Sequence, residues 1–307
     1  MTTVELGSSE TTASRVILGL MRIKEKTDAE IRTLVGTARE AGVTMFDHAD
    51  IYGGPHGCEQ RYGDAAPVPA AERDQILLQS KVGIRSGFFD SSREHILSSV
   101  DQSLAALRTE YLDVLLIHRP DTLVEPDEVA AAFDELHSKG KVRAFGVSNH
   151  TPGQIELLRK SVRQPLIANQ LQFSIANAAL VAQGLAANIM GLEQSADRDL
   201  GILDYSRLNN ITLQTWGSVQ SPASGVFIGD RTNYPALNDA LDEIANAHST
   251  SADAIAIAWL ARHPAQMQIV IGTTTPSRVQ DAAAGAAIRL SREEWYRLYT
   301  AAGNTLP

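Results

Sequence analysis

The chain has 307 residues, a formal net charge of -9 and a hydrophobic content of 44%. This composition is sufficient for one sizeable buried core and argues against a disordered chain. The acidic balance argues against nucleic-acid or anionic-membrane partners, although a local basic pocket for one phosphate is compatible with it. The single cysteine, Cys58, allows neither an internal disulfide nor a cysteine-based zinc site, and we interpret it as a buried thiol in a reducing compartment. With no basic, apolar leader and no stretch long enough to cross a bilayer, we expect a cytoplasmic protein.

Eight apolar runs rich in β-branched residues recur along the chain, and most of the intervals between them have helical periodicity. The runs cover residues 15–20, 43–47, 75–80, 111–118, 141–148, 166–172, 211–216 and 268–273. Strand followed by helix at roughly thirty-residue spacing predicts an α/β fold of the (β/α)8 TIM barrel type. An open, doubly wound sheet is the alternative. Because no linker divides the chain, we interpret residues 1–307 as one domain.

Helix start signals lie at the head of several intervals. They are Thr27 with Glu30 and Ser91 with Glu94 as capping boxes, Pro126 as a first helical residue, and the group Thr151, Pro152 and Gln154. Two stretches, residues 174–210 and 217–234, exceed what a plain barrel needs. Since long βα loops lie over a barrel mouth, we expect both there, with 217–234 as a lid or cofactor strap. A longer helical layer is the alternative for 174–210.

The common nucleotide and metal motifs are absent from the sequence. There is no GxGxxG after the first strand, no GxxxxGK[ST], no HExxH and no GxSxG. The glycines of residues 52–57 do not lead into a periodic helix, and we interpret them as loop flexibility. We therefore expect no metal site, and no dinucleotide site of the open-sheet type.

Four residues of the kinds that carbonyl reduction needs lie at the ends of apolar runs: Asp47, Tyr52, Lys81 and His118. Because βα loops open onto one face, these side chains are predicted to meet there. Hydride transfer to a carbonyl leaves negative charge on its oxygen, which requires a proton donor near neutral pH. The Tyr52 phenol suits this task if Lys81 lowers its pKa from about 10. Asp47 would hold the ammonium, and a neutral His118 would donate a hydrogen bond to the substrate oxygen.

Segments in the same order carry a resemblance to a known family. They are residues 47–53 (DHADIYG), 80–81 (SK), 116–120 (LIHRP) and 146–149 (GVSN). With these motifs the chain resembles the aldo-keto reductase superfamily along almost its whole length. The resemblance implies a (β/α)8 barrel that binds NADPH across its mouth and reduces a small aldehyde or ketone. It implies Tyr52 as general acid with Lys81 lowering its pKa. Asp47 would pair with Lys81, and His118 would orient the carbonyl.

The same resemblance implies a set of cofactor contacts. They are Ser148, Asn149 and Gln170 for the nicotinamide carboxamide, Trp216 for stacking on the ring, Gly217 where the family commonly has serine, Thr273 and Thr274 for phosphates, and Arg278 for the 2′-phosphate. Because Thr273 replaces a common lysine, we expect only a modest preference for NADPH over NADH. Met21, Phe88 and Phe89 suggest an apolar mouth for substrates with a carbon-rich substituent.

Two other classes of function remain open from the sequence. A lysine at a strand end suits a Schiff-base aldolase with Lys81 as nucleophile, although Asp47 would favour the charged form of the lysine. Some members of the superfamily serve chiefly as regulatory partners of membrane channels. A non-catalytic, nicotinamide-binding subunit is therefore the second alternative.

Overall fold

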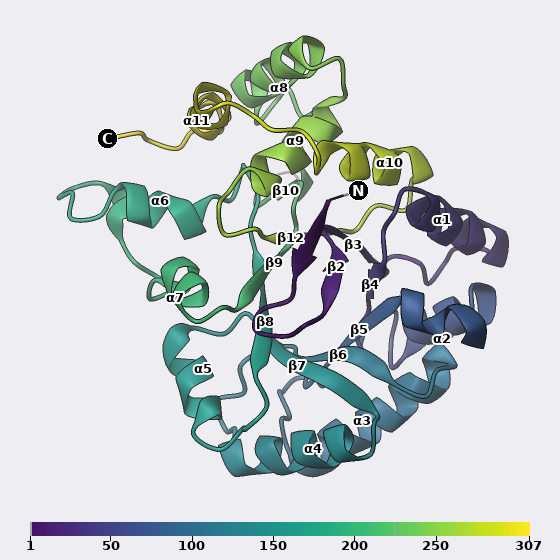
Figure 1. The fold of residues 1–307 in the computed structure, drawn as a ribbon. Coiled ribbons are helices and arrows are strands. Elements are labelled where there is room, and N and C mark those ends of the chain that lie inside the picture. The colour runs from purple at the N-terminus through teal and green to yellow at the C-terminus, as the bar shows by residue number, and fades with distance from the viewer. Residues whose placement is uncertain (1, 224) are drawn as a thin grey trace.

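Eight parallel strands close into a barrel in the computed structural model, which describes residues 2–223 and 225–307 (Figure 1). Around the barrel they are β12 (Gln268–Ile271), β3 (Val16–Gly19), β4 (Met45–Asp47), β5 (Leu77–Val82), β6 (Leu112–Ile117), β7 (Val142–Ser148), β8 (Leu166–Gln172) and β9 (Thr212–Trp216). The order follows the chain, and β12 closes the ring between β9 and β3. The predicted (β/α)8 barrel is confirmed. The doubly wound alternative is wrong, because this sheet closes on itself and has no edge strand.

Helices surround the barrel (Figure 1). They are α1 (Asp28–Glu40), α2 (Gly57–Ala65), η1 (Ala70–Gln75), α3 (Arg93–Leu107), α4 (Pro126–Ser138), α5 (Pro152–Arg159), α6 (Ala179–Leu185), η2 (Glu193–Ser195), α7 (Ile202–Leu208), α8 (Pro235–Ala247), α9 (Ala252–Ala261), α10 (Pro276–Gly285) and α11 (Arg292–Ala301). None of these helices in the described part of the chain has the length and apolar character needed to cross a membrane.

Most of the local start signals act where the sequence places them. The Thr27 capping box with Glu30 is formed at α1, and α4 begins at Pro126. The Ser91 capping box is wrong: Ser92 is the N-cap of α3, and its hydroxyl accepts a hydrogen bond from the backbone of His95. The Ser91 hydroxyl has no hydrogen-bond partner among the described residues, and its backbone N–H donates to Asp121 on a neighbouring loop.

The glycine-rich segment 52–57 ends in a helix that the sequence does not predict. Gly57 is the first residue of α2, and His56 before it has a φ of 52° in the left-handed region. The periodicity of α2 is weak because it buries polar as well as apolar residues, among them Glu59. Cys58 on the same helix is buried, as expected, and its thiol donates to the Met21 carbonyl.

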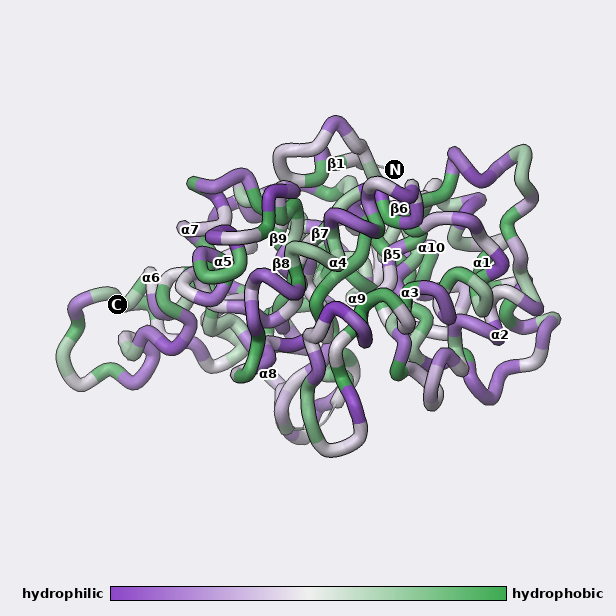
Figure 2. Tube along the Cα trace, turned by 90° about the horizontal axis from the view of Figure 1, so that it is seen from below, coloured by the Kyte–Doolittle hydropathy of each residue, from purple (hydrophilic) through white to green (hydrophobic). Residues whose placement is uncertain are grey.

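A short hairpin covers one end of the barrel. Its strands β1 (Thr3–Glu5) and β2 (Thr12–Ser14) pair antiparallel, and their apolar side chains Val4 and Ala13 are buried against barrel-interior residues such as Ile17. Figure 2 shows this hairpin at one end of the molecule, and the helices in the same view carry both hydrophobic and hydrophilic segments. The last residues of the barrel strands, among them Asp47 of β4, therefore lie at the opposite end.

The two long stretches are built differently. Residues 174–210 contain α6, η2 and α7, and α7 packs against β9 and α5. Residues 217–234 contain the antiparallel pair β10 (Gln220–Ser221) and β11 (Gly225–Val226), while residue 224 of this stretch lies outside the described residues. The C-terminal part of this stretch is held by Asn238 on α8. The Asn238 side chain forms hydrogen bonds with the backbones of Gly229, Phe227 and Tyr234.

Two glycines inside helices differ in the space around them. An added Cβ at Gly36 in α1 meets nothing within 4 Å, whereas one at Gly63 in α2 meets the Ala106 carbonyl oxygen of α3 at 2.1 Å. We expect Gly36→Ala to raise the free energy of unfolding by about 0.5–1 kcal/mol through helix propensity. We expect Gly63→Ala to lower it by about 1–3 kcal/mol through overpacking. Urea denaturation measures the free energy of unfolding of both variants. An equal increase in that free energy for Gly36→Ala and Gly63→Ala would show that α2 and α3 are not packed this closely.

Candidate active site

The four predicted catalytic residues come together at the end of the barrel opposite the hairpin. Asp47 is the last residue of β4, Tyr52 lies in the loop after it, and His118 directly follows β6. Lys81 does not follow its strand as the sequence suggests, because β5 extends to Val82. Its side chain is buried inside the barrel. Side chains alternate between the two faces of a strand, so Lys81 lies on the same face of β5 as Gln79.

Lys81 is the centre of the cluster. Its ammonium donates hydrogen bonds to Asp47 Oδ2 at 2.6 Å, to the His48 carbonyl at 2.8 Å and to the Tyr52 hydroxyl at 3.2 Å. An ammonium has three donors, so all of them are used. Because the Tyr52 oxygen accepts from Lys81, its own proton remains available to a group in the pocket.

Burial and charge act in opposite directions on this cluster. Burial lowers the pKa of Lys81, but the Asp47 carboxylate and Tyr52 beside it raise it, and the result lies above the ordinary value. Burial raises the pKa of the Tyr52 phenol, and the Lys81 charge only partly opposes this. The pKa of Tyr52 is thus raised overall, because the phenol is largely removed from water. The sequence, in contrast, suggests a lowered pKa.

His118 is neutral in this environment. Burial, together with the charges of Lys81 and Arg119, lowers the pKa of its imidazole to about 2. Its ring meets that of Tyr52 edge-on at 5.7 Å between centroids, and its buried Nδ1 has no hydrogen-bond partner among the described residues. A neutral ring held beside the phenol can donate one hydrogen bond to an oxygen that Tyr52 also reaches.

A network of glutamines inside the barrel holds Asp47. Asp47 Oδ1 accepts from the Gln79 amide at 2.6 Å and from the Gln170 amide at 3.1 Å. Gln214 accepts from both of these glutamines and donates to Gln79 and to Gln268. These amides satisfy the buried carboxylate on the side away from Lys81. The sequence interpretation missed the network, although glutamines inside otherwise apolar strands are its signal.

The residues assigned to the nicotinamide carboxamide lie side by side on neighbouring strands. Ser148 donates to the Gln170 carbonyl, and the Asn149 amide donates to Ser148 Oγ and to the His118 carbonyl. Trp216 donates from its indole N–H to Asn149 Oδ1 at 3.0 Å. The Asn149 side chain is thus fully engaged within the protein. The Gln170 Oε1, in contrast, has no hydrogen-bond partner among the described residues.

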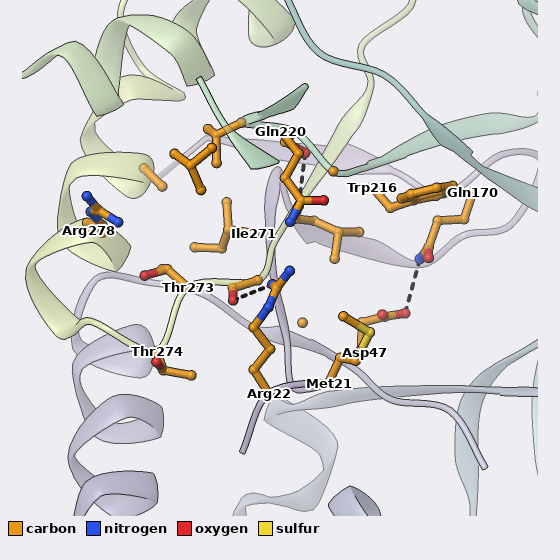
Figure 3. A pocket seen from close by; sticks show the side chains of 18 of the residues that line it. Met21, Arg22, Asp47, Gln170, Trp216, Gln220, Ile271, Thr273, Thr274 and Arg278 are labelled. Atoms are coloured by element: carbon orange, nitrogen blue, oxygen red, sulfur yellow. Dashed lines mark hydrogen bonds between the residues drawn. The ribbon is translucent and has the colours of Figure 1, made fainter. Parts of the chain in front are cut away.

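An elongated cavity of about 490 Å³ joins this cluster to the first turn of α10. Figure 3 shows Trp216, Gln170 and Asp47 at one end of the cavity, Arg278 at the other, and Thr273 and Thr274 on the Arg278 side. Gly217 also lines the cavity, with a φ of 65° that favours glycine.

Other lining residues were not anticipated from the sequence. Arg22 and Gln220 extend toward each other across the cavity in Figure 3. Arg119 lies over the Trp216 ring, with its guanidinium carbon 5.7 Å from the ring centroid, and Asp253 lines the Arg278 end. Their signal in the sequence is weak because each belongs to a loop, a two-residue strand or a helix start whose position depends on the closed barrel.

Some expectations about the mouth are not met. Met21 lines the cavity, but Phe88 and Phe89 are exposed and lie outside its described lining, so they do not make an apolar mouth. Residues of 217–234 line the cavity, whereas no described residue of 174–210 does.

Within residues 2–223 and 225–307, no group of three His, Cys, Asp or Glu side chains is placed to hold a metal ion.

Comparison with known proteins shows the family to which the chain belongs. The model of the aldo/keto reductase family matches residues 15–302. YcsN of Bacillus subtilis (strain 168), an uncharacterized oxidoreductase, is 36% identical over 303 residues, which cover 94% of each chain. A 6-dehydroglucose reductase of Agrobacterium fabrum is 33% identical over 304 residues, again 94% of each. The protein belongs to the aldo/keto reductase family and is an oxidoreductase of that family.

Solved structures share the fold. A thermostable aldo-keto reductase crystallised with the inhibitor epalrestat superimposes with a TM-score of 0.77 at 24% identity, covering 98% of this chain and 100% of that one. A glycerol dehydrogenase of Gluconobacter oxydans gives a TM-score of 0.78 at 23% identity, covering 99% and 96%. The sequence-based recognition of the family is confirmed.

The glutamine network gives a stability test of the site. Gln79→Leu removes a donor to Asp47 and leaves Gln214 partly unpaired, so we expect the free energy of unfolding to fall by about 1–3 kcal/mol. The double variant Gln79→Leu/Gln214→Leu should lose less than the sum of the single variants, because both partners are removed together. Gln102→Leu on the exposed face of α3 is the control. Strict additivity in urea denaturation would contradict the coupling.

Proposed function

We propose that this protein is an NADPH-dependent reductase that converts small aldehydes or ketones to alcohols, with Tyr52 as the proton donor. The observation that carries the proposal is the Lys81 ammonium held between Asp47 and the Tyr52 hydroxyl in a cavity that also contains the neutral His118. Relatives named 6-dehydroglucose reductase support a carbonyl substrate. The buried, single Cys58 supports a reducing compartment such as the cytoplasm.

The residues that line the cavity fit a nicotinamide dinucleotide. At one end, the Gln170 Oε1 acceptor suits the carboxamide, and Trp216 offers a flat ring for stacking. At the other end, Thr273, Thr274 and Arg278 supply hydroxyls and a guanidinium that suit phosphates. The length of the cavity, with the reactive cluster at only one end (Figure 3), supports an extended ligand. We therefore propose Gln170, Trp216, Thr273, Thr274 and Arg278 as cofactor contacts.

The chain's own residues would perform the proton transfer. A bound reduced nicotinamide supplies the hydride. His118 donates a hydrogen bond to the carbonyl oxygen and orients it, and Tyr52 gives its proton to that oxygen as negative charge develops. The Lys81 ammonium, already within hydrogen-bond distance of the Tyr52 oxygen, stabilises the phenolate that remains. Asp47 keeps Lys81 charged and in place.

The state of Lys81 argues against the aldolase alternative. A Schiff-base nucleophile must be neutral, whereas the carboxylate of Asp47 and the hydroxyl of Tyr52 raise the pKa of Lys81 despite its burial. The regulatory-subunit alternative has no observation of its own in its favour. Negligible turnover across a broad aldehyde panel, together with a co-purifying partner, would support it.

We expect Tyr52→Phe to bind NADPH as the wild-type chain does but to lose at least about a hundredfold in turnover, the low end for removal of a general acid. The substitution removes only the hydroxyl. Loss of nicotinamide absorbance with a panel of aldehydes, ketones and 6-dehydroglucose measures the rate, and Tyr296→Phe on α11 is the matched control. Turnover within a few-fold of wild type would rule out Tyr52 as the proton donor.

We expect Arg278→Ala to weaken NADPH binding by roughly 1.5–3 kcal/mol, the range for hydrogen bonds to a charged group, and to leave NADH nearly unchanged. Calorimetric titration of each cofactor measures this. Arg163→Ala, at an exposed arginine before β8, controls for the loss of one positive charge. Equal losses for both cofactors would give Arg278 a structural role and move the search for the 2′-phosphate site to residues 217–234.

A further inference from the structure

The 2′-phosphate end of the cavity contains an acidic residue that faces its arginine. Asp253 lies in the first turn of α9, and its Oδ1 is 3.6 Å from Nε of Arg278 in the first turn of α10. Both residues line the cavity. Their side chains are partly exposed, 25% for Asp253 and 48% for Arg278, so a ligand can reach both.

The position of Asp253 relative to Arg278 is fixed by the packing of α9 against α10. Gly285 of α10 lies so close to α9 that an added Cβ would meet the Ala254 carbonyl oxygen at 2.3 Å. The first turn of α9 is further held by its N-cap, because the Ser251 hydroxyl accepts from the backbone of Ala254. The close packing therefore sets the spacing between the two helices that carry the acidic residue and the arginine.

The local charge is unfavourable for a dianionic group. Arg278 is paired with Asp253, and Asp281 one turn further along α10 adds a second carboxylate whose charge acts on Asp253. Thr273, at the start of the same segment, contributes a hydroxyl but no charge. A 2′-phosphate must compete with the Asp253 carboxylate for the Arg278 guanidinium. A 2′-hydroxyl meets no such repulsion, because a carboxylate accepts its hydrogen bond.

We infer that Asp253 is the residue that limits discrimination between NADPH and NADH in this protein, by occupying Arg278 and repelling the 2′-phosphate. The inference rests on the proposed nicotinamide site and concerns its selectivity, not its chemistry. Asp253 is thus a specificity-determining residue: its charge keeps NADH competitive in a cavity that otherwise has the arginine expected for NADPH. Removal of that charge, with the shape kept, turns the chain into a more selective NADPH binder.

Asp253→Asn tests this with calorimetric titration of NADPH and NADH, and needs no turnover. The dissociation constant for NADPH should fall about three- to tenfold, as expected for one partly exposed charge at close range, while that for NADH should change less than about twofold. Asp253→Glu keeps the charge and should preserve the wild-type ratio. Asp101→Asn removes an exposed carboxylate that pairs with Lys141 outside the described cavity lining, and should change neither constant.

The outcomes separate the inference from the proposal beneath it. If wild type binds both cofactors and Asp253→Asn leaves their ratio within about twofold, Asp253 does not set selectivity. If Asp101→Asn tightens NADPH as much, the effect is one of net charge and the inference is also wrong. If wild type binds neither cofactor, the proposed function fails first, and the inference fails with it. Thermal unfolding of each variant confirms that a folded chain was titrated.

Discussion

The buried ion pair between Lys81 and Asp47 is the constraint on which the rest of the site depends. Both side chains are almost fully removed from water, and charges in such a place are costly unless every donor and acceptor is satisfied. The ammonium uses its three donors on Asp47, a carbonyl and Tyr52, and the carboxylate takes its remaining bonds from Gln79 and Gln170. The polar interior of the barrel at this level follows from the need to keep one pair of charges buried.

The outer face of β5, the strand that carries Lys81, supports the loop that contains Tyr52. Ser80, next to Lys81, points away from the interior and donates to the buried carboxylate of Glu59 on α2 at 2.5 Å. Glu59 also contacts His56, and these hydrogen bonds outweigh the effect of burial, so that the pKa of Glu59 is lowered. The backbone N–H of Cys58 in turn donates to the Tyr52 carbonyl. One strand thus positions the cation from its inner face and the phenol from its outer face.

The sequence predicted the parts that depend on local pattern. Each of the eight apolar runs contains or overlaps a barrel strand, because a strand buried on both sides needs a continuous apolar run. The family motifs picked out side chains that meet in the structure for the same reason: they lie within short segments. The glutamine network could not be predicted, since Gln79 and Gln214 are 135 positions apart and meet only when the barrel closes. The hairpin of β1 and β2 was missed because its strands are three residues long and carry little pattern.

The two ends of the cavity differ in how they are built, and this difference bears on how selectivity can vary. The reactive end consists of buried side chains on neighbouring strands, where a change such as loss of the Gln79 amide also leaves buried partners unpaired. The Arg278 end consists of partly exposed side chains on the first turns of two helices, where one substitution alters a charge without opening the core. Stability therefore restrains the residues at the Lys81 end of the cavity far more than those at the Arg278 end. Under the proposed function, the reaction is fixed by the fold, whereas the cofactor preference can change by single substitutions.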